Sequence, residues 1–523
     1  MELRKKNVRM NKRKCKSNLQ ITLEDDFNVP DTKPDVDRIV TEEGNIEITE
    51  SNILNGKLMV KGVLHFQLLY ISQESEQLVH NIQGKMEFDE MVNMEQLQAG
   101  DDIKVKWDLE DLNISLINSR KISVKSVVSL MCCAWEIHEE EVAVDIDEKE
   151  EIPCRYRKMN LTELVVDKKD IMRLKEEFRL PTGKPNIYQV LYHNIHLQGV
   201  EMRIQEGQIL IRGEMVLFVL YTADEDRGQM QYYEAQQPFH NVIPCNGCQE
   251  NMVLQVEKEF SPGELQIKQD EDGEERMMDA EMAINLDIHV YKDEEVEYLA
   301  DLYSTKKDLK LELLPVEYPH LVLKNRIEKR LAEQITLEKQ QNPILQICHS
   351  HGMVQIDEQE WQEDGIHIEG SVEVKVLYLG EADTWPIGEE KITVPFEHVI
   401  EGVGDATDKT FEIMPEIEQI STMLLGRGVI EVKATVNMEV LIFEKMTSQQ
   451  LQQITEQEFD LEKLESMPSM SGYLVKAEED LWSIAKKFHT TVEDIMELND
   501  LEEQNVKTGD KLLLMKTMVT VHR

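Results

Sequence analysis

Three stretches of sequence repeat one pattern: GKLMVKGVLHFQLLY at residues 56–70, GQILIRGEMVLFVLY at 207–221 and GIHIEGSVEVKVLY at 365–378. In each copy the central glycine is followed eight residues later by a tyrosine, and that tyrosine eighteen residues later by a phenylalanine. Equal spacing in three copies indicates an internal repeat. The matched residues are Gly62, Tyr70 and Phe88, then Gly213, Tyr221 and Phe239, then Gly370, Tyr378 and Phe396.

Apolar residues alternate on both sides of each central glycine, which is the period of a β-strand with one buried face. A glycine weakens a strand interior, so its presence there predicts a β-bulge or a close backbone approach. Turn-forming pairs at Asn55-Gly56, Glu206-Gly207 and Asp364-Gly365 predict hairpins just upstream. The apolar positions are Leu58, Val60, Leu64, Phe66 and Leu68, then Ile209, Ile211, Met215, Leu217 and Val219, then Ile366, Ile368, Val372, Val374 and Val376.

The similarity extends upstream, where Phe27 and Pro34 correspond to Phe178 and Pro185, and each copy ends in a further alternating segment. The third copy holds these places with Ile335 and Pro343. The predicted fold class is mainly β, with three tandem β-rich domains expected to be independent modules. The predicted boundaries are a basic tail at 1–18, repeats at 19–145, 160–313 and 320–447, a linker at 448–472 and a last domain at 473–517.

The last domain follows a β-α-α-β pattern. Tyr473 to Val475 form a short predicted strand, and Leu512 to Met515 return as a second. Asp480 and Thr491 are each placed to cap a helix whose apolar residues recur at helical spacing. This part of the chain is therefore a small domain of a different kind from the repeats.

Composition limits the classes of protein to consider. The length of 523 residues corresponds to three or four domains rather than one. A formal charge of −45 disfavours general nucleic-acid binding, because phosphate requires a basic surface. No apolar run is long enough to cross a membrane, and residues 1–17 lack the apolar core of a secretory signal. The seven cysteines do not suggest a disulfide framework and fit a reducing cytoplasm.

The segment from Tyr473 to Met515 resembles a LysM domain, through Tyr473, Val475, Leu481 to Ala485, Phe488, Thr491, Leu498-Asn499, Leu501, Gly509 and Leu512. The three upstream copies resemble the SPOCS repeats of spore-coat proteins. Three such repeats followed by one LysM domain resemble the SipL type of coat morphogenesis protein.

The resemblance implies a non-enzymatic scaffold in the mother-cell cytoplasm, at the forespore surface, which binds a spore-coat ATPase of SpoIVA type and other coat proteins. It implies a LysM domain that contacts protein, with no cofactor. Where LysM domains commonly read Gly-Asp-Thr, this chain has Glu478, Glu479 and Asp480, which replaces a glycan-contacting glycine by a carboxylate. Peptidoglycan binding through the LysM domain is the alternative, and a two-carboxylate glycan hydrolase is a third class.

The candidate partner-binding residues lie in the LysM domain and include its acidic positions. Trp482 and its apolar neighbours are interpreted as core, with an exposed interaction patch as the alternative. The acidic residues face either a basic partner or only solvent. The candidates are Val475, Glu478, Glu479, Asp480, Trp482, Asp500 and Leu501.

Other candidate sites carry little chemistry, and no catalytic residue or metal ligand is predicted. Cys245 and Cys248 have the spacing of half a zinc site, but no second pair follows, and the Asn-Gly between them indicates a turn. Cys348, His349 and His351 lead into a strand, where the two histidines would share a face. Gly426 and Gly428 predict a hairpin turn.

The eight cations within residues 1–17 allow three interpretations. The basic tail could hold an anionic membrane surface or an acidic coat partner. It could also be a disordered terminus, or contact the acidic repeats of the same chain.

Overall fold

The structure is a computed structural model that describes residues 1–73, 75, 77–147, 152–224, 229–337, 342–401, 404–426, 428–457 and 469–515. Repeat 1 contains β1 (Leu3–Asn28), β2 (Arg38–Leu54), β3 (Lys57–Ile71), β4 (Val79–Asn93), β5 (Asp102–Asn118) and β6 (Lys121–Ile146). Repeat 2 contains β7 (Cys154–Arg179), β8 (Ile187–Gln205), β9 (Gln208–Ala223), β10 (Met230–Pro244), β11 (Val253–Phe260), β12 (Glu264–Gln269) and β13 (Glu275–Leu302). Repeat 3 contains β14 (Asp308–Thr336), β15 (Ile344–Gln362), β16 (Gly365–Gly380), β17 (Ile387–Glu401), β18 (Lys409–Gly426) and β19 (Val429–Gln457). The last domain contains β20 (Met470–Leu474), α2 (Leu481–Phe488), α3 (Val492–Leu498) and β21 (Lys511–Met515).

Each repeat consists of two antiparallel sheets that enclose an apolar core. In repeat 1 the sheets have the strand orders β1-β6-β5 and β2-β3-β4, and repeat 3 has β14-β19-β18 and β15-β16-β17. Repeat 2 follows the same plan, except that its fifth strand is divided into β11 and β12, which both pair with β13. A separate cluster of buried side chains fills each repeat. The predicted mainly-β fold and its internal repeat are therefore confirmed.

The repeated spacing of glycine and phenylalanine has a direct structural cause. Gly62 lies opposite Phe88 on the neighbouring strand, and the equivalent pairs in the other repeats are also in register. A side chain at Gly62 would meet the Phe88 ring at 2.4 Å, so the ring occupies the space above the glycine. The strand on the other side of each glycine has a β-bulge at this level, next to Ile48, Gln198 and Ile356. The expected close approach is therefore present at each glycine, whereas the β-bulge lies on the neighbouring strand and not in the strand that carries the glycine.

Replacing Gly370 by alanine is expected to destabilise the protein by about 1–3 kcal/mol, because the added carbon overpacks a filled space. It would lie 2.5 Å from the carbonyl oxygen of Gln355 and 2.9 Å from the Phe396 ring. Gly426→Ala is the matched control, since no atom of the residues that the structure describes lies within 4 Å of its added carbon. Equal free energies of unfolding for the two variants, measured by chemical denaturation, would contradict this explanation.

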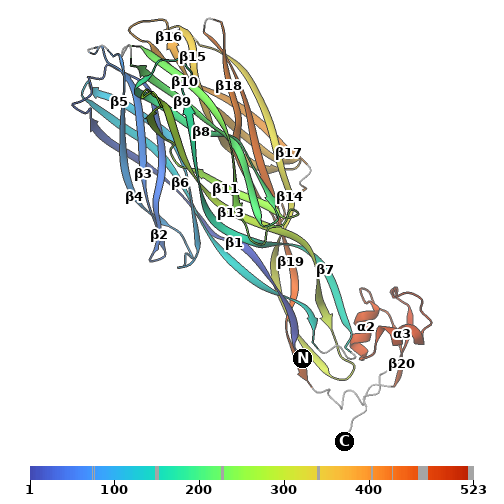
Figure 1. The fold of residues 1–523 in the computed structure, drawn as a ribbon. Coiled ribbons are helices and arrows are strands. Elements are labelled where there is room, and N and C mark those ends of the chain that lie inside the picture. Colours follow the sequence, from blue (N-terminus) through green and yellow to red (C-terminus); the bar gives the residue numbers. More distant parts are fainter. Residues whose placement is uncertain are drawn as a thin grey trace.

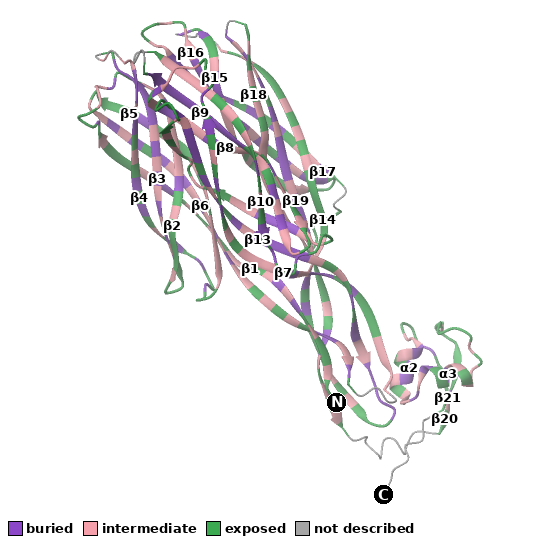
Figure 2. Ribbon diagram, viewed as in Figure 1, coloured by how far each residue is buried: buried purple, intermediate pink, exposed green. Residues whose placement is uncertain are grey.

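The three repeats share an interior, which is most evident in β9 at the middle of the body (Figure 2). Every residue from Met215 to Ala223 is buried, so this part of the strand is covered on both faces. Met215 and Tyr221 belong to the core of repeat 2, whereas Phe218 and Leu220 belong to a cluster that all three repeats build. The other members of this shared cluster are Leu69, Ile71 and Val79 from repeat 1, Leu191 and Tyr192 from repeat 2, and Cys348, Leu377 and Ile387 from repeat 3.

The expectation of independent modules is therefore wrong. Alternating apolar residues account for one buried face of a strand, but the second face of β9 is also apolar and is buried against the other repeats. The three repeats form one elongated body in which their strands lie side by side (Figure 1). Each repeat keeps its own core inside this body.

A narrow stalk extends from the body and is built from the first and last strands of each repeat (Figure 1). All three strand pairs have a β-bulge at the same point, next to Arg13, Leu164 and Leu321. Bulges increase local twist and bend a strand, which fits the change from broad body to narrow stalk. The stalk interior is apolar and combines all three repeats, through Val8, Met10, Val142, Met159, Leu161, Val296, Tyr298, Val316 and Tyr318.

The predicted basic tail is part of this stalk. Residues 3–28 form the single strand β1, which pairs with β6 along its length. Val8 and Met10 lie in the stalk interior, and cations on either side of this pair meet carboxylates. Lys5 pairs with Glu141 at 2.7 Å, and Lys6 pairs with Glu294 of repeat 2. The structure thus favours intramolecular contact over a free tail, because this segment combines apolar positions with charges opposite to those of its neighbours.

The predicted linker at 448–472 is only partly a connection. Residues 448–457 complete β19, residues 458–468 lie outside the described residues, and β20 begins at Met470.

Gly426 and Gly428 flank the β18–β19 connection, as the predicted hairpin requires. Of the helices in the described ranges, none has the length and apolar character needed to cross a membrane.

Candidate functional site

The last domain is held together by two capped helices and a small core. Asp480 accepts a hydrogen bond from the backbone N–H of Ser483, and Thr491 accepts one from Asp494, so both predicted helix caps are confirmed. The strands β20 and β21 pair antiparallel. The core of this domain contains Val475, Leu481, Ile484, Ala485, Val492, Ile495, Leu512 and Leu514.

This domain lies against the end of the stalk (Figure 1). Arg155 at the start of β7 forms an ion pair with Asp480 at 2.8 Å. The Trp482 indole N–H donates a hydrogen bond to Asp301 Oδ2 at 2.8 Å, and Lys486 pairs with the same carboxylate. These three contacts are all made with residues of repeat 2.

The contact between the stalk and the last domain also includes a buried side chain, Tyr303. Tyr303 follows β13 in repeat 2, yet its ring belongs to the core of the last domain and only 3% of it is exposed. The hydroxyl donates to the Thr490 carbonyl oxygen at 2.9 Å, and the ring packs edge-on against Trp482 at 5.0 Å. Burial raises the pKa of Tyr303 well above its usual value. The core of the last domain is therefore completed by a side chain from repeat 2.

The structure distributes the seven candidate residues among different roles. Val475 is 2% exposed and belongs to the core. Glu479 accepts hydrogen bonds from the Tyr473 hydroxyl at 2.7 Å and from the Lys476 backbone N–H at 3.0 Å, which lower the pKa of Glu479. Glu479 therefore stabilises its own loop.

Asp480 and Trp482 face the stalk rather than a free surface. Burial works against ionisation of Asp480, but the Ser483 and Arg155 contacts outweigh it and lower the pKa of Asp480. Trp482 is half-buried, and part of its covering comes from Tyr303. The interpretation of Trp482 as core of the small domain alone missed this contact, since Arg155, Asp301 and Tyr303 are distant in sequence.

Three candidates remain on the outside of the domain. Glu478 and Asp500 are exposed, and both have left-handed backbones, with φ of 65° and 52°. Leu501 is half-buried against the core cluster. Glu478 therefore has the backbone conformation that a glycine adopts most readily, although it carries a carboxylate.

Glu478→Gly is expected to stabilise the last domain by up to about 1 kcal/mol. A left-handed conformation costs an L-residue about 1–2 kcal/mol, and the greater freedom of glycine in the unfolded chain offsets part of the gain. Glu502→Gly is the control, because Glu502 is exposed without a left-handed backbone and should lose stability. Hydrogen exchange of α2 and α3 measures the change. A loss of protection in Glu478→Gly would contradict the prediction.

The cysteine and histidine candidates have structural roles. Cys245 and Cys248 form a disulfide within the predicted turn, and among the described residues Cys15, Cys132, Cys133 and Cys348 take part in no disulfide. His349 pairs with Glu234 at 2.8 Å, and His351 pairs with Glu43 at 3.2 Å. The two imidazoles stack at 5.6 Å, which confirms the shared face, and they join repeat 3 to the other repeats.

Comparison with known families now adds to this geometry. The family described as SipL, SPOCS domain, matches residues 35–117, 186–267 and 343–425, and the LysM domain family matches residues 473–514. The chain is a SipL-type protein with three SPOCS domains and a C-terminal LysM domain. Each SPOCS match begins just before the second strand of a repeat and ends within the fifth, which in repeat 2 is the segment β12. The strands that build the stalk lie outside the matched segments.

These families place the chain among sporulation-related proteins with a module of the peptidoglycan-binding LysM class. SPOCS and LysM domains are non-catalytic families. No curated protein and no solved structure matches the chain.

Proposed function

We propose that this SipL-type chain is a non-enzymatic scaffold that links a spore-coat ATPase of SpoIVA type to other coat components at the forespore surface, in the mother-cell cytoplasm. The observation that carries the proposal is the position of the LysM domain. It lies at the end of the stalk, away from the broad SPOCS body (Figure 1). This separation allows two large partners to bind the same chain without overlapping.

In this proposal the LysM domain binds the ATPase through its outer acidic residues. Asp480 and Trp482 contact residues of the stalk, and Glu479 accepts hydrogen bonds within its own domain. Glu478 and Asp500 remain exposed, with Glu502 and Glu503. A carboxylate at position 478, in place of a glycine that approaches glycan, favours a basic protein surface as the ligand.

The test uses the full chain, because Tyr303 completes the LysM core. Glu478→Lys combined with Asp500→Lys is expected to weaken capture of the purified ATPase by at least about tenfold, through charge reversal at two exposed sites. Glu95→Lys with Glu271→Lys is the matched control, since both are exposed acidic residues of the SPOCS body. Unchanged capture by the LysM variant would contradict the proposed binding surface.

Peptidoglycan binding is the second candidate, because the LysM family match and the left-handed backbone at Glu478 retain the framework of a glycan-binding loop. Sedimentation of the same proteins with purified peptidoglycan separates the two functions. The scaffold proposal expects no sedimentation of the wild-type chain and strong capture of the ATPase. Strong sedimentation without capture would favour the second candidate.

A further inference from the structure

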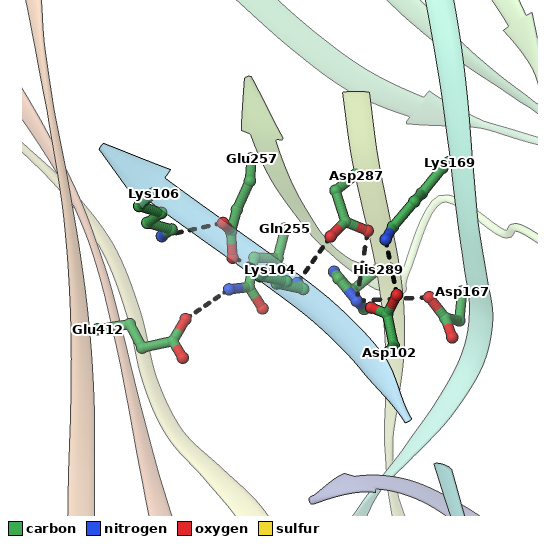
Figure 3. Close-up of polar contacts among 10 residues, drawn as sticks. All are labelled: Asp102, Lys104, Lys106, Asp167, Lys169, Gln255, Glu257, Asp287, His289 and Glu412. Carbon is green, nitrogen blue, oxygen red and sulfur yellow. Dashed lines mark hydrogen bonds and ion pairs between the residues drawn. The ribbon is translucent and has the colours of Figure 1, made fainter. Parts of the chain in front are cut away.

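A cluster of charged residues lies where the three SPOCS repeats meet (Figure 3). Its outer members are exposed, whereas its centre is buried. His289 lies within it and is only 2% exposed. Within the described part of the chain, neither of its ring nitrogens makes a hydrogen bond, and Asp287 Oδ1 is also buried without one. Buried polar atoms without partners are costly, so these three atoms require an explanation.

The arrangement follows from β-sheet geometry. Asp287 and His289 are alternate residues of β13, so their side chains leave the strand on the same face. Asp167 on β7 is the direct cross-strand partner of His289. The opposite face of β13 carries Leu286 and Ile288, which fill the core of repeat 2. Three potential ligands thus converge on one side of two adjacent strands.

The distances suit a small metal ion. His289 Nε2 lies 3.5 Å from Asp167 Oδ1 and 3.7 Å from Asp287 Oδ1. One ligand atom from each residue lies within 4.8 Å of the other two. Zinc bonds of about 2.0–2.2 Å place tetrahedral ligands roughly 3.3–3.6 Å apart. The two distances from His289 Nε2 are close to this spacing, and the Asp167 and Asp287 oxygens lie within 4.8 Å of each other.

The surrounding charges also favour a dication. Lys104 from repeat 1 occupies the other oxygen of Asp287 at 2.8 Å and leaves Oδ1 free. Lys106 pairs with Glu257 at 2.9 Å, and Lys169 with Asp102 at 2.6 Å. The cluster contains five carboxylates and three ammonium groups, so its charge is −2 when His289 is neutral. The carboxylates are Asp102, Asp167, Glu257, Asp287 and Glu412, and the cations are Lys104, Lys106 and Lys169.

We propose that Asp167, Asp287 and His289 bind one divalent transition-metal ion of the Zn²⁺ class, which clamps β7 to β13 at the junction of the three repeats. An imidazole ligand favours Zn²⁺ and similar ions over Ca²⁺ or Mg²⁺, which prefer oxygen ligands alone. The ion balances the charge of the cluster and provides a partner for two of the three unpartnered atoms, His289 Nε2 and Asp287 Oδ1.

Calorimetric titration of the chelator-treated full chain with Zn²⁺ tests the proposal. We expect a site with a stoichiometry of one, which His289→Gln and Asp167→Asn each weaken by at least about 100-fold, since even changes to outer partners of a metal ligand cost 10–100-fold. His349→Gln is the matched control, because His349 is also buried beside a carboxylate. It should retain the site.

Thermal unfolding gives a second measurement. Each variant is compared with itself, with and without Zn²⁺, so a difference in stability between the metal-free variants does not affect the result. Zn²⁺ should raise the melting temperature of the wild type and of His349→Gln, but not of His289→Gln or Asp167→Asn. Mg²⁺ should have no effect. Absence of Zn²⁺ binding by the wild type, or a site that persists in both ligand variants, would overturn the proposal.

Discussion

Replacing Phe218 by alanine is expected to loosen the contact among all three repeats and to destabilise it by about 3–5 kcal/mol. Phe218 is fully buried in the shared cluster, and its ring stacks on His349 of repeat 3 at 4.2 Å. The substitution leaves a cavity between the repeats. The core of repeat 2 should be less affected, because β9 contributes to that core with its other face.

The buried thiol of Cys348 measures this effect from another repeat. Cys348 belongs to the shared cluster, and burial raises the pKa of Cys348 to about 12, so it should react slowly with thiol reagents. Phe218→Ala is expected to speed its labelling about 10²–10³-fold, since each 1.4 kcal/mol corresponds to a factor of ten. Cys132, in the core of repeat 1, is the internal reference and should accelerate less. An unchanged Cys348 rate would show that the repeats are not coupled through Phe218.

Replacing Tyr303 by alanine is expected to unfold the LysM domain while the SPOCS body stays folded. Deleting a buried aromatic ring costs about 3–5 kcal/mol, which is comparable with the whole stability of a domain this small. Tyr303→Phe is the matched control, because it keeps the ring and loses only the hydrogen bond to Thr490, at about 1 kcal/mol.

Hydrogen exchange of the full chain separates these outcomes. In Tyr303→Ala, protection should disappear from α2 and α3 and persist in β3, β9 and β16. In Tyr303→Phe it should persist throughout. Full protection of both helices in Tyr303→Ala would mean that the LysM domain is stable without the stalk.

Local patterns predicted the elements of this fold well. Alternating apolar residues identified the central strands, and the spacing from Gly62 to Phe88 reflected a real cross-strand pair. Asp480 and Thr491 marked the two helix starts. These features depend on residues that are close in sequence or on adjacent strands. The sequence pattern can therefore predict them without a structure.

The packing between repeats was missed, although the sequence contained a signal for it. The run from Met215 to Tyr221 is apolar at every position, which is typical of a strand buried on both faces rather than on one. The stalk was missed in part because its first strand, β1, begins with many charges, and such a segment resembles a disordered tail until its partners are known. Lys6 illustrates this, since its partner Glu294 belongs to another repeat.

The candidate site was only partly predictable, because its contacts also join residues that are distant in sequence. The acidic loop at 478–480 was visible in the sequence, but the roles of its members depend on Arg155 and Tyr473. The sequence did not predict a role for His289, because its cross-strand partner Asp167 is remote in sequence. Contacts of this kind arise from topology, not from local pattern.

The central claim is that the three SPOCS repeats form one body with a common interior. Hydrogen exchange in increasing denaturant tests it most directly, because it gives an opening free energy for β3, β9 and β16 separately. We expect these three strands to share one opening free energy and to lose protection together. Three distinct free energies, with each repeat opening alone, would contradict the account.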